Sequence, residues 1–94
     1  MVGLTFGIAL QLHYRDEIRG MAIWSNTPFT DFVHKVMTKF ENPYGLALRF
    51  KDDDGGIISL KDETDYELSL ETASLREGPT GKMERKLELW CADL

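Results

Sequence analysis

Residues 50–65 read FKDDDGGIISLKDETD, and in this stretch two acidic groups flank a short apolar run. Apolar residues alternate before the first acidic group, and the Asp-Gly step within it is a turn signal, so a β-hairpin with strands at 46–50 and 57–60 is predicted. Thr64 and Glu67 have the spacing of a capping box, which predicts that a helix opens soon after the second strand. The stretch therefore predicts strand, turn, strand and helix, with carboxylates in the turn and at the start of the helix.

The segment before this stretch predicts another hairpin and a helix. Apolar residues alternate over 8–14, a turn follows, and residues 18–24 form the partner strand. Thr27 as N-cap and Pro28 as the first helical residue mark the start of a helix. Apolar side chains then recur every three or four positions, as on the buried face of an amphipathic helix: Phe29, Phe32, Val33, Val36, Met37 and Phe40.

The segment after the acidic stretch completes the predicted fold. Tyr66 belongs to the buried side of the second helix, which is followed by a loop at 78–81. The last strand, at 86–91, alternates so that Cys91 faces inward and Trp90 outward. The order ββαββαβ predicts an α+β domain, a mixed five-stranded sheet with two helices packed on one face. This order is compatible with a ubiquitin-like β-grasp.

Length and cysteine content limit the class of protein. The chain has 94 residues, a mass of 10.8 kDa and one cysteine. This length predicts a single domain over residues 1–94, which we expect to be excised from a larger protein, and no apolar run reaches the ~18 residues of a membrane span. One cysteine excludes an internal disulfide and suits a reducing compartment, so we expect a cytoplasmic location.

The charge of the chain is distributed unevenly. The net charge is −5, and eight of the 16 acidic residues lie between Asp52 and Glu71, where Lys61 is the only base. A solvated acidic face that only aids solubility is one explanation. Clustered like charges repel one another, however, which favours a surface that meets a basic partner. The acidic balance disfavours nucleic acid as that partner.

No catalytic site, metal site or cofactor is expected. An EF-hand calcium loop with Gly55 at its sixth position would have Phe50 at the first and Lys61 at the twelfth, where oxygen ligands are required. Cys91 is on the inward face of a strand and the two histidines do not converge with it, so no nucleophile–base pair is predicted. These observations favour a binding module over an enzyme.

Residues 50–65 resemble the acidic OPCA motif of PB1 (Phox and Bem) domains, and the element order and Glu17-Ile18-Arg19 at the second strand match that family as well. PB1 domains are ubiquitin-like β-grasp modules that pair front to back, an acidic face against a basic face. The resemblance implies a type I domain, a protein–protein interaction module that heterodimerises through its acidic face. The residues that it assigns to partner binding are Asp52, Asp53, Asp54, Asp62, Glu63, Asp65 and Glu67.

Three positions depart from the pattern of the family. Gly56 stands where an acidic residue is usual, Gln11 aligns with the lysine of the basic face, and Gly20 aligns with its second arginine, although Arg15 and Arg19 remain. The resemblance therefore implies an acidic-only domain. Its expected partner is the basic (type II) PB1 domain of another protein, with no front-to-back homopolymer, no nucleic acid, no membrane span and no cofactor.

The parent protein and two other functional classes stay open. Residues 86–91 resemble the last strand of the PB1 domain in cytosolic activators of NADPH oxidase, and exchange factors of the fungal cell-polarity pathway are the other candidate parents. Both would place the domain in a cytoplasmic signalling complex. A ubiquitin-like small-GTPase-binding domain or generic ubiquitin-like adaptor is the alternative, although GTPase-binding domains usually present basic residues. An enzyme fragment is the third class.

Overall fold

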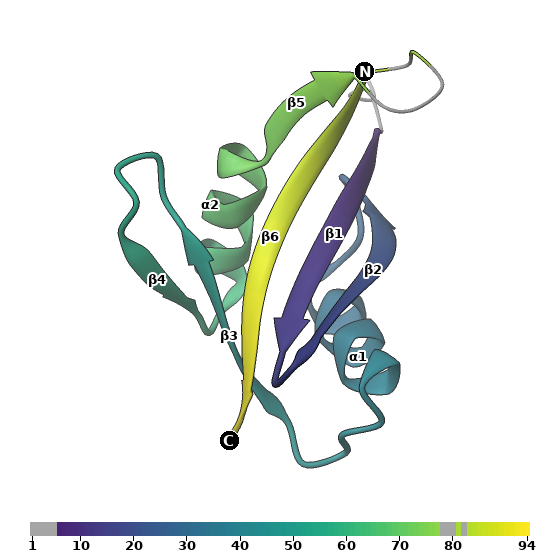
Figure 1. The fold of residues 1–94 in the computed structure, drawn as a ribbon, viewed down its shortest axis with the longest axis vertical. Coiled ribbons are helices and arrows are strands. Elements are labelled where there is room, and N and C mark those ends of the chain that lie inside the picture. Colours follow the sequence, from purple (N-terminus) through teal and green to yellow (C-terminus); the bar gives the residue numbers. More distant parts are fainter. Residues whose placement is uncertain (1–5, 78–80, 82) are drawn as a thin grey trace.

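The computed structural model describes residues 6–77, 81 and 83–94, which form one mixed sheet with two helices on the same face (Figure 1). The strands are β1 (Gly7–Tyr14), β2 (Glu17–Trp24), β3 (Leu46–Lys51), β4 (Ile57–Leu60), β5 (Ser74–Glu77) and β6 (Met83–Asp93). The helices are α1 (Phe29–Lys39) and α2 (Glu63–Thr72). The strand order is β2-β1-β6-β3-β4, with β1 and β6 parallel and the other pairs antiparallel. This arrangement confirms the predicted α+β, ubiquitin-like β-grasp fold.

The sequence did not predict β5. This strand has four residues and pairs antiparallel with the start of β6, with Ser74 opposite Lys86. β6 is also longer than the predicted strand at 86–91, because it continues at one end beside β5 and at the other beside β3. Of the predicted loop at 78–81, only Gly81 belongs to the described residues.

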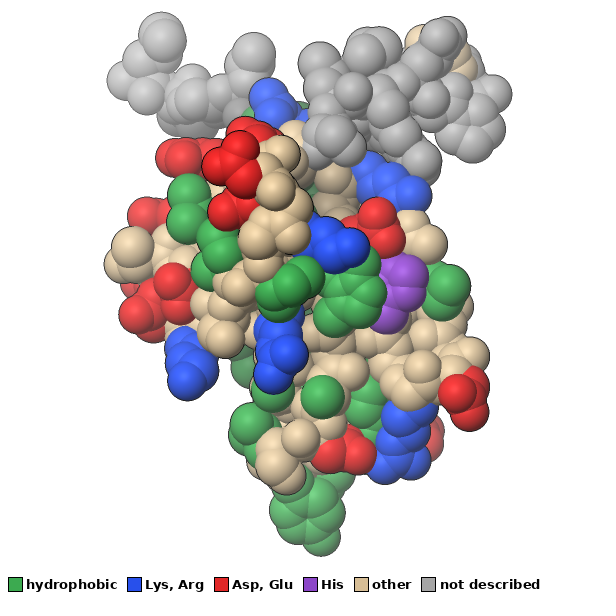
Figure 2. Space-filling view, turned by 60° about the vertical axis from the view of Figure 1, so that its left-hand side comes forward, with side chains coloured by type: hydrophobic (Ala, Val, Ile, Leu, Met, Phe, Trp, Pro, Cys, Tyr) green, Lys and Arg blue, Asp and Glu red, His purple; other side chains and the backbone are tan. Residues whose placement is uncertain are grey.

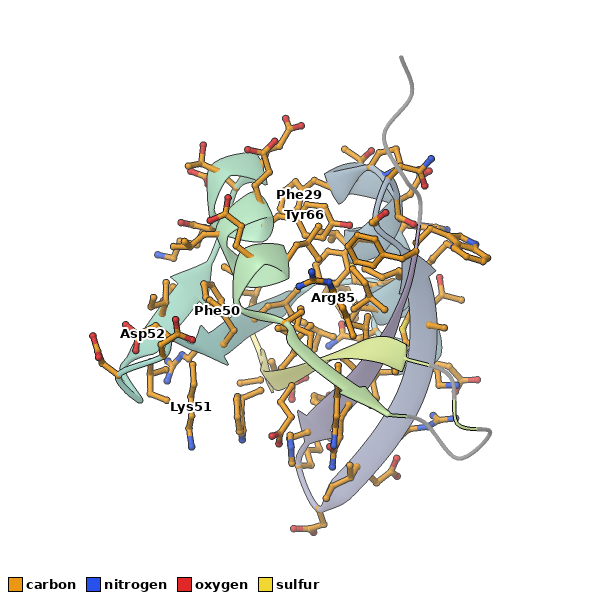
Figure 3. The ribbon with its side chains drawn as sticks, turned by 90° about the horizontal axis from the view of Figure 1, so that it is seen from above. Phe29, Phe50, Lys51, Asp52, Tyr66 and Arg85 are labelled. Carbon is orange, nitrogen blue, oxygen red and sulfur yellow. The ribbon has the colours of Figure 1, made fainter. Side chains whose placement is uncertain are left out.

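The hydrophobic core lies between the sheet and the helices. Its buried members are Ile8, Leu10, Leu12, Ile23, Phe32, Val36, Leu48, Phe50, Leu60, Tyr66, Ala73, Leu87, Leu89 and Cys91. Tyr66 joins the two helices: its ring lies beside that of Phe29, with 5.6 Å between ring centres (Figure 3). Its hydroxyl donates a hydrogen bond of 2.7 Å to the carbonyl of Thr27. Burial raises the pKa of the Tyr66 hydroxyl, which keeps it a hydrogen-bond donor. The core therefore holds the acidic stretch on a packed scaffold.

Both helices begin at residues other than those predicted. α1 starts at Phe29 with Pro28 as an N-cap that provides no side-chain bond, while Thr27 Oγ1 accepts a hydrogen bond of 2.9 Å from the Trp24 amide. The prediction of Thr27 as N-cap is therefore wrong, because its hydroxyl closes the turn that leaves β2. The predicted Thr64–Glu67 capping box is also wrong, since α2 starts at Glu63.

Asp93 ties the end of β6 to the β1–β2 turn and to the α1–β3 loop. Its carboxylate accepts hydrogen bonds from the Tyr14 hydroxyl (2.5 Å), the Arg15 guanidinium (2.6 Å) and the Asn42 amide (3.0 Å). The bonds from Arg15 and Tyr14 lower the pKa of Asp93, and the same contact raises the pKa of Tyr14. Arg15 itself has a positive φ of 53° at the predicted turn.

Candidate functional site

The first acidic group lies in the loop that joins β3 to β4, and Asp52 organises that loop. Asp52 Oδ1 accepts hydrogen bonds from the amides of Asp54 (3.0 Å) and Gly56 (2.7 Å). The backbone closes the same turn, because the Asp52 amide donates to the Gly56 carbonyl at 2.9 Å and the Gly55 amide donates to the Asp52 carbonyl at 3.0 Å. Gly55 has a φ of 82°, a conformation that glycine adopts without steric cost. Asp52 is therefore partly a structural residue.

Gly56 contributes to the same close packing. A Cβ built on it would lie 3.1 Å from Asp52 Oδ2, tighter than an ordinary van der Waals contact. An acidic residue, which the family pattern leads one to expect at this position, would require the Asp52 carboxylate to shift. The shape of this loop therefore accounts for glycine at position 56.

Asp53 and Asp54 are the exposed members of the first group. Both side chains are solvent-exposed, and neither carboxylate has a hydrogen bond or ion pair among the described residues. The bonds that Asp52 makes fix the backbone that carries them. The loop thus presents two unpaired carboxylates at the end of a hairpin.

The second acidic group forms the start of α2. Asp62 is the N-cap, and its Oδ1 accepts a hydrogen bond of 2.9 Å from the Asp65 amide. Asp65 Oδ2 in turn accepts a bond of 3.0 Å from the Lys61 amide. The amides of Asp65 and Lys61 are thus both satisfied by carboxylates, and negative charge at a helix N-terminus is favourable. Glu63 and Glu67 are exposed and have no such bond among the described residues.

The fold brings both acidic groups to one side of the molecule. β4 separates them along the chain by four residues, or about 13 Å of strand. α2 begins at the end of β4 away from the β3–β4 loop and runs back alongside the hairpin, so the second group lies on the same side of the molecule as the loop (Figure 1). Figure 2 shows Asp and Glu side chains gathered at the upper left of this face. We call the set formed by Asp52, Asp53, Asp54, Asp62, Glu63, Asp65 and Glu67 the acidic surface.

The residues of the predicted remnant basic face lie elsewhere, and their side chains have partners. Arg15 bonds to Asp93, and Arg19 Nη1 donates to the Lys39 carbonyl at 3.0 Å while its guanidinium lies 5.9 Å from the Phe40 ring centre. Gln11 lies opposite Gly20 on β2. The sequence did not reveal that both arginines take part in internal contacts, because their partners are 20 and 78 residues away.

Other chemistry is limited in the part of the chain that the structure describes. Cys91 is buried, and burial raises the pKa of its thiol to about 11. Among residues 6–77, 81 and 83–94, no three His, Cys, Asp or Glu side chains are placed to hold a metal ion. No helix in these ranges is both long and apolar enough to cross a membrane.

Comparison with known protein families identifies one match. The family model of the PB1 domain matches residues 7–93, which include every strand and helix of the fold. PB1 domains are interaction modules that bind other PB1 domains, and they are not a family of enzymes. Comparison with curated proteins finds no significant match.

Proposed function

Because the chain belongs to the PB1 domain family, we propose that it is a type I domain whose acidic surface binds the basic face of a partner PB1 domain. One observation supports this proposal most directly. Four exposed carboxylates have no partner among the described residues. Three further carboxylates, which we call the framework residues, accept hydrogen bonds from the backbone that carries them. The unpaired four are Asp53, Asp54, Glu63 and Glu67. The three framework residues are Asp52, Asp62 and Asp65.

The framework residues also keep acceptor capacity. Asp52 and Asp62 each use only Oδ1 in their described bonds, and Asp65 uses only Oδ2. A carboxylate oxygen that already accepts an amide hydrogen bond is fixed in direction, so its other oxygen is fixed as well. A lysine ammonium has three donors and no acceptor, and it makes strong charged hydrogen bonds to several carboxylates at once. The acidic surface suits such a group.

The same carboxylates favour encounter with a basic surface. Clustered negative charge attracts a cationic partner over a distance, repels acidic proteins and is screened by salt. The interaction that we propose is therefore faster and tighter at low ionic strength. It requires no reaction and no cofactor.

We infer that the domain heterodimerises and does not form chains. Front-to-back polymers need a basic face and an acidic face on one domain. Gln11 and Gly20 stand at two positions of the basic face, and Arg15 and Arg19 already have partners within the fold. The resemblance of residues 86–91 to oxidase activators supports a cytoplasmic complex that regulates NADPH oxidase. A complex of the cell-polarity pathway is the alternative.

Calorimetric titration of single variants with a basic-type PB1 domain tests the proposal. Asp54→Asn and Glu63→Gln each remove one unpaired charge and should weaken binding, and the double variant should weaken it further. Asp31→Asn is the matched control, because Asp31 is an exposed carboxylate in the first turn of α1, outside the acidic surface. Equal affinity of all the variants would refute the acidic docking surface.

A further inference from the structure

β6 lacks a neighbouring strand over part of one edge. On one side, β1 pairs with it from Arg85 to Cys91. On the other side, β5 pairs with residues 83–86 and β3 pairs with residues 90–93. Residues 87–89 therefore have no strand partner on that side. Figure 1 shows the division, with β5 and β3 along the same edge of β6 and α2 behind the space between them.

A hollow of about 170 Å³ lies at this division. Its lining consists of Lys51, Thr72, Lys86, Leu87, Glu88 and Trp90. Pockets for small-molecule ligands usually exceed about 300 Å³. The hollow is large enough to hold several water molecules or one polar side chain. Its size therefore fits part of a partner protein better than a metabolite.

The Trp90 indole forms a fixed wall of the hollow. The His13 ring on β1 stacks on it, with 5.0 Å between ring centres and 5° between planes, and the Lys51 ammonium on β3 lies 4.8 Å from the indole centre. Because β6 runs between β1 and β3, the indole is held from both neighbouring strands. His13 Nε2 also lies 2.8 Å from Glu88 Oε2, which fixes the imidazole.

The charge of the hollow is opposite to that of the acidic surface. The lining has two cationic side chains, Lys51 and Lys86, and one carboxylate, that of Glu88, so the cations are in excess; Lys86 and Glu88 both have partners already. The Lys51 ammonium has no hydrogen bond or ion pair among the described residues. Figure 3 shows the Lys51 side chain extending away from α2, whereas Phe50 beside it lies on the α2 side of the strand. The hollow thus opens between β5 and β3, with Lys51, Glu88 and Trp90 on the face that the helices leave open, while Thr72 ends α2 and Leu87 belongs to the core.

We propose that this hollow receives a carboxylate side chain from an acidic segment of a partner protein that lies across the open face of the sheet. The carboxylate bonds to the Lys51 ammonium, and its aliphatic stem packs on the Trp90 indole. On β1, Ala9 and Gln11 lie opposite Lys86 and Glu88 of the hollow and are partly exposed. The hollow shares no residue with the acidic surface, although Lys51 directly precedes Asp52, and the proposal does not depend on the function of that surface.

The test is a titration of the isotope-labelled chain with an acetylated hexaglutamate peptide at constant ionic strength. The indole N–H signal of Trp90 and the amides of residues 87–89 should shift and saturate, and the indole signal of Trp24, on the edge strand β2, serves as the internal control. Lys51→Gln should weaken the binding about fivefold, as expected for loss of one charged hydrogen bond at an exposed site. Lys35→Gln, which changes an exposed lysine of α1, should leave the binding unchanged.

Three results would overturn the proposal. Hexaglutamine could produce the same shifts as hexaglutamate, which would mean that the carboxylate is not recognised. Lys51→Gln could bind hexaglutamate as tightly as the unchanged chain while its spectrum shows the same fold, which would mean that Lys51 does not bind the carboxylate. The signals of residues 87–90 could shift with protein concentration alone, which would make a second copy the occupant. A failure of hexaglutamate binding leaves the calorimetric test of the acidic surface unaffected, because that test uses a basic partner.

Discussion

Replacing Asp52 by alanine should destabilise the domain, whereas replacing Asp54 by alanine should not. Asp52 Oδ1 accepts two backbone hydrogen bonds, from Asp54 and Gly56. A net hydrogen bond contributes about 0.5–1.5 kcal/mol, so loss of both in Asp52→Ala should lower the free energy of unfolding by about 1–3 kcal/mol. In a domain of this size, such a loss lowers the melting temperature by roughly 5–15 °C. Asp54 accepts no described bond, and Asp54→Ala should change the stability by less than ~0.5 kcal/mol.

Urea unfolding of the variants, followed by tryptophan fluorescence, measures these differences. Asp52→Asn is the informative third variant, because its amide oxygen still accepts both backbone bonds while the negative charge is lost. It should retain most of the stability and still bind a basic partner more weakly. The reasoning fails if Asp52→Ala lies within ~0.3 kcal/mol of the unchanged chain, or if Asp54→Ala is as destabilising as Asp52→Ala.

Three further predictions concern the core, the Asp93 network and the cysteine. Phe32 is fully buried, so Phe32→Ala should cost about 3–5 kcal/mol in thermal or urea unfolding, and an unchanged midpoint would contradict the assigned helix face. Arg15 and Tyr14 lower the pKa of Asp93, so its carboxylate stabilises the fold above the usual aspartate pKa of about 3.9, and this contribution is lost as pH falls through the lowered folded value. Asp93→Asn should therefore be less stable than the unchanged chain at pH 7, and the gap between their urea midpoints should narrow as the pH falls below about 3.9; a constant gap would refute the role of the charge. Burial raises the pKa of Cys91 to about 11, so at pH 8 iodoacetamide should alkylate the folded chain at least about 100-fold more slowly than the chain in urea, and equal rates would contradict its burial.

The hairpin and the inward faces of the strands were predictable because several local signals agree there. Asp-Gly turn chemistry, alternation and the apolar run at 57–60 all indicate the same pair of strands. Cys91 and Trp90 face the sides that alternation predicts, the first buried and the second partly exposed. The fold class followed from the order of these elements.

The start of α2 was not predictable because two overlapping patterns fit it. Thr64 with Glu67 and Asp62 with Asp65 both have the three-residue spacing of a cap, and only the second pair forms a capping bond, from the Asp65 amide to the Asp62 side chain. The complete burial of Ser69 was also not predicted. Its hydroxyl donates a hydrogen bond to the Tyr66 carbonyl one turn earlier, and this bond allows a polar side chain to be buried. Local spacing does not distinguish such cases.

The different roles of the carboxylates in the acidic surface could not be predicted from the sequence. The sequence grouped Asp52 with Asp53 and Asp54, since the three are identical and adjacent. Only the loop geometry shows that the first fixes the backbone and the other two face solvent. The stacking of His13 on Trp90 likewise depends on the parallel pairing of β1 with β6, which joins residues 77 positions apart. Pairing between distant strands leaves no local signal.

The most direct test of the acidic docking surface is an NMR titration of the labelled domain with a lysine-bearing PB1 domain at low and high ionic strength. We predict that the shifted amides fall within residues 52–54 and 62–67, and that the affinity falls as salt is added. Shifts confined to the opposite end of the domain, around Arg15 and Arg19, would contradict the account. So would the absence of any shift with several such domains, which would make a small-GTPase partner the next candidate.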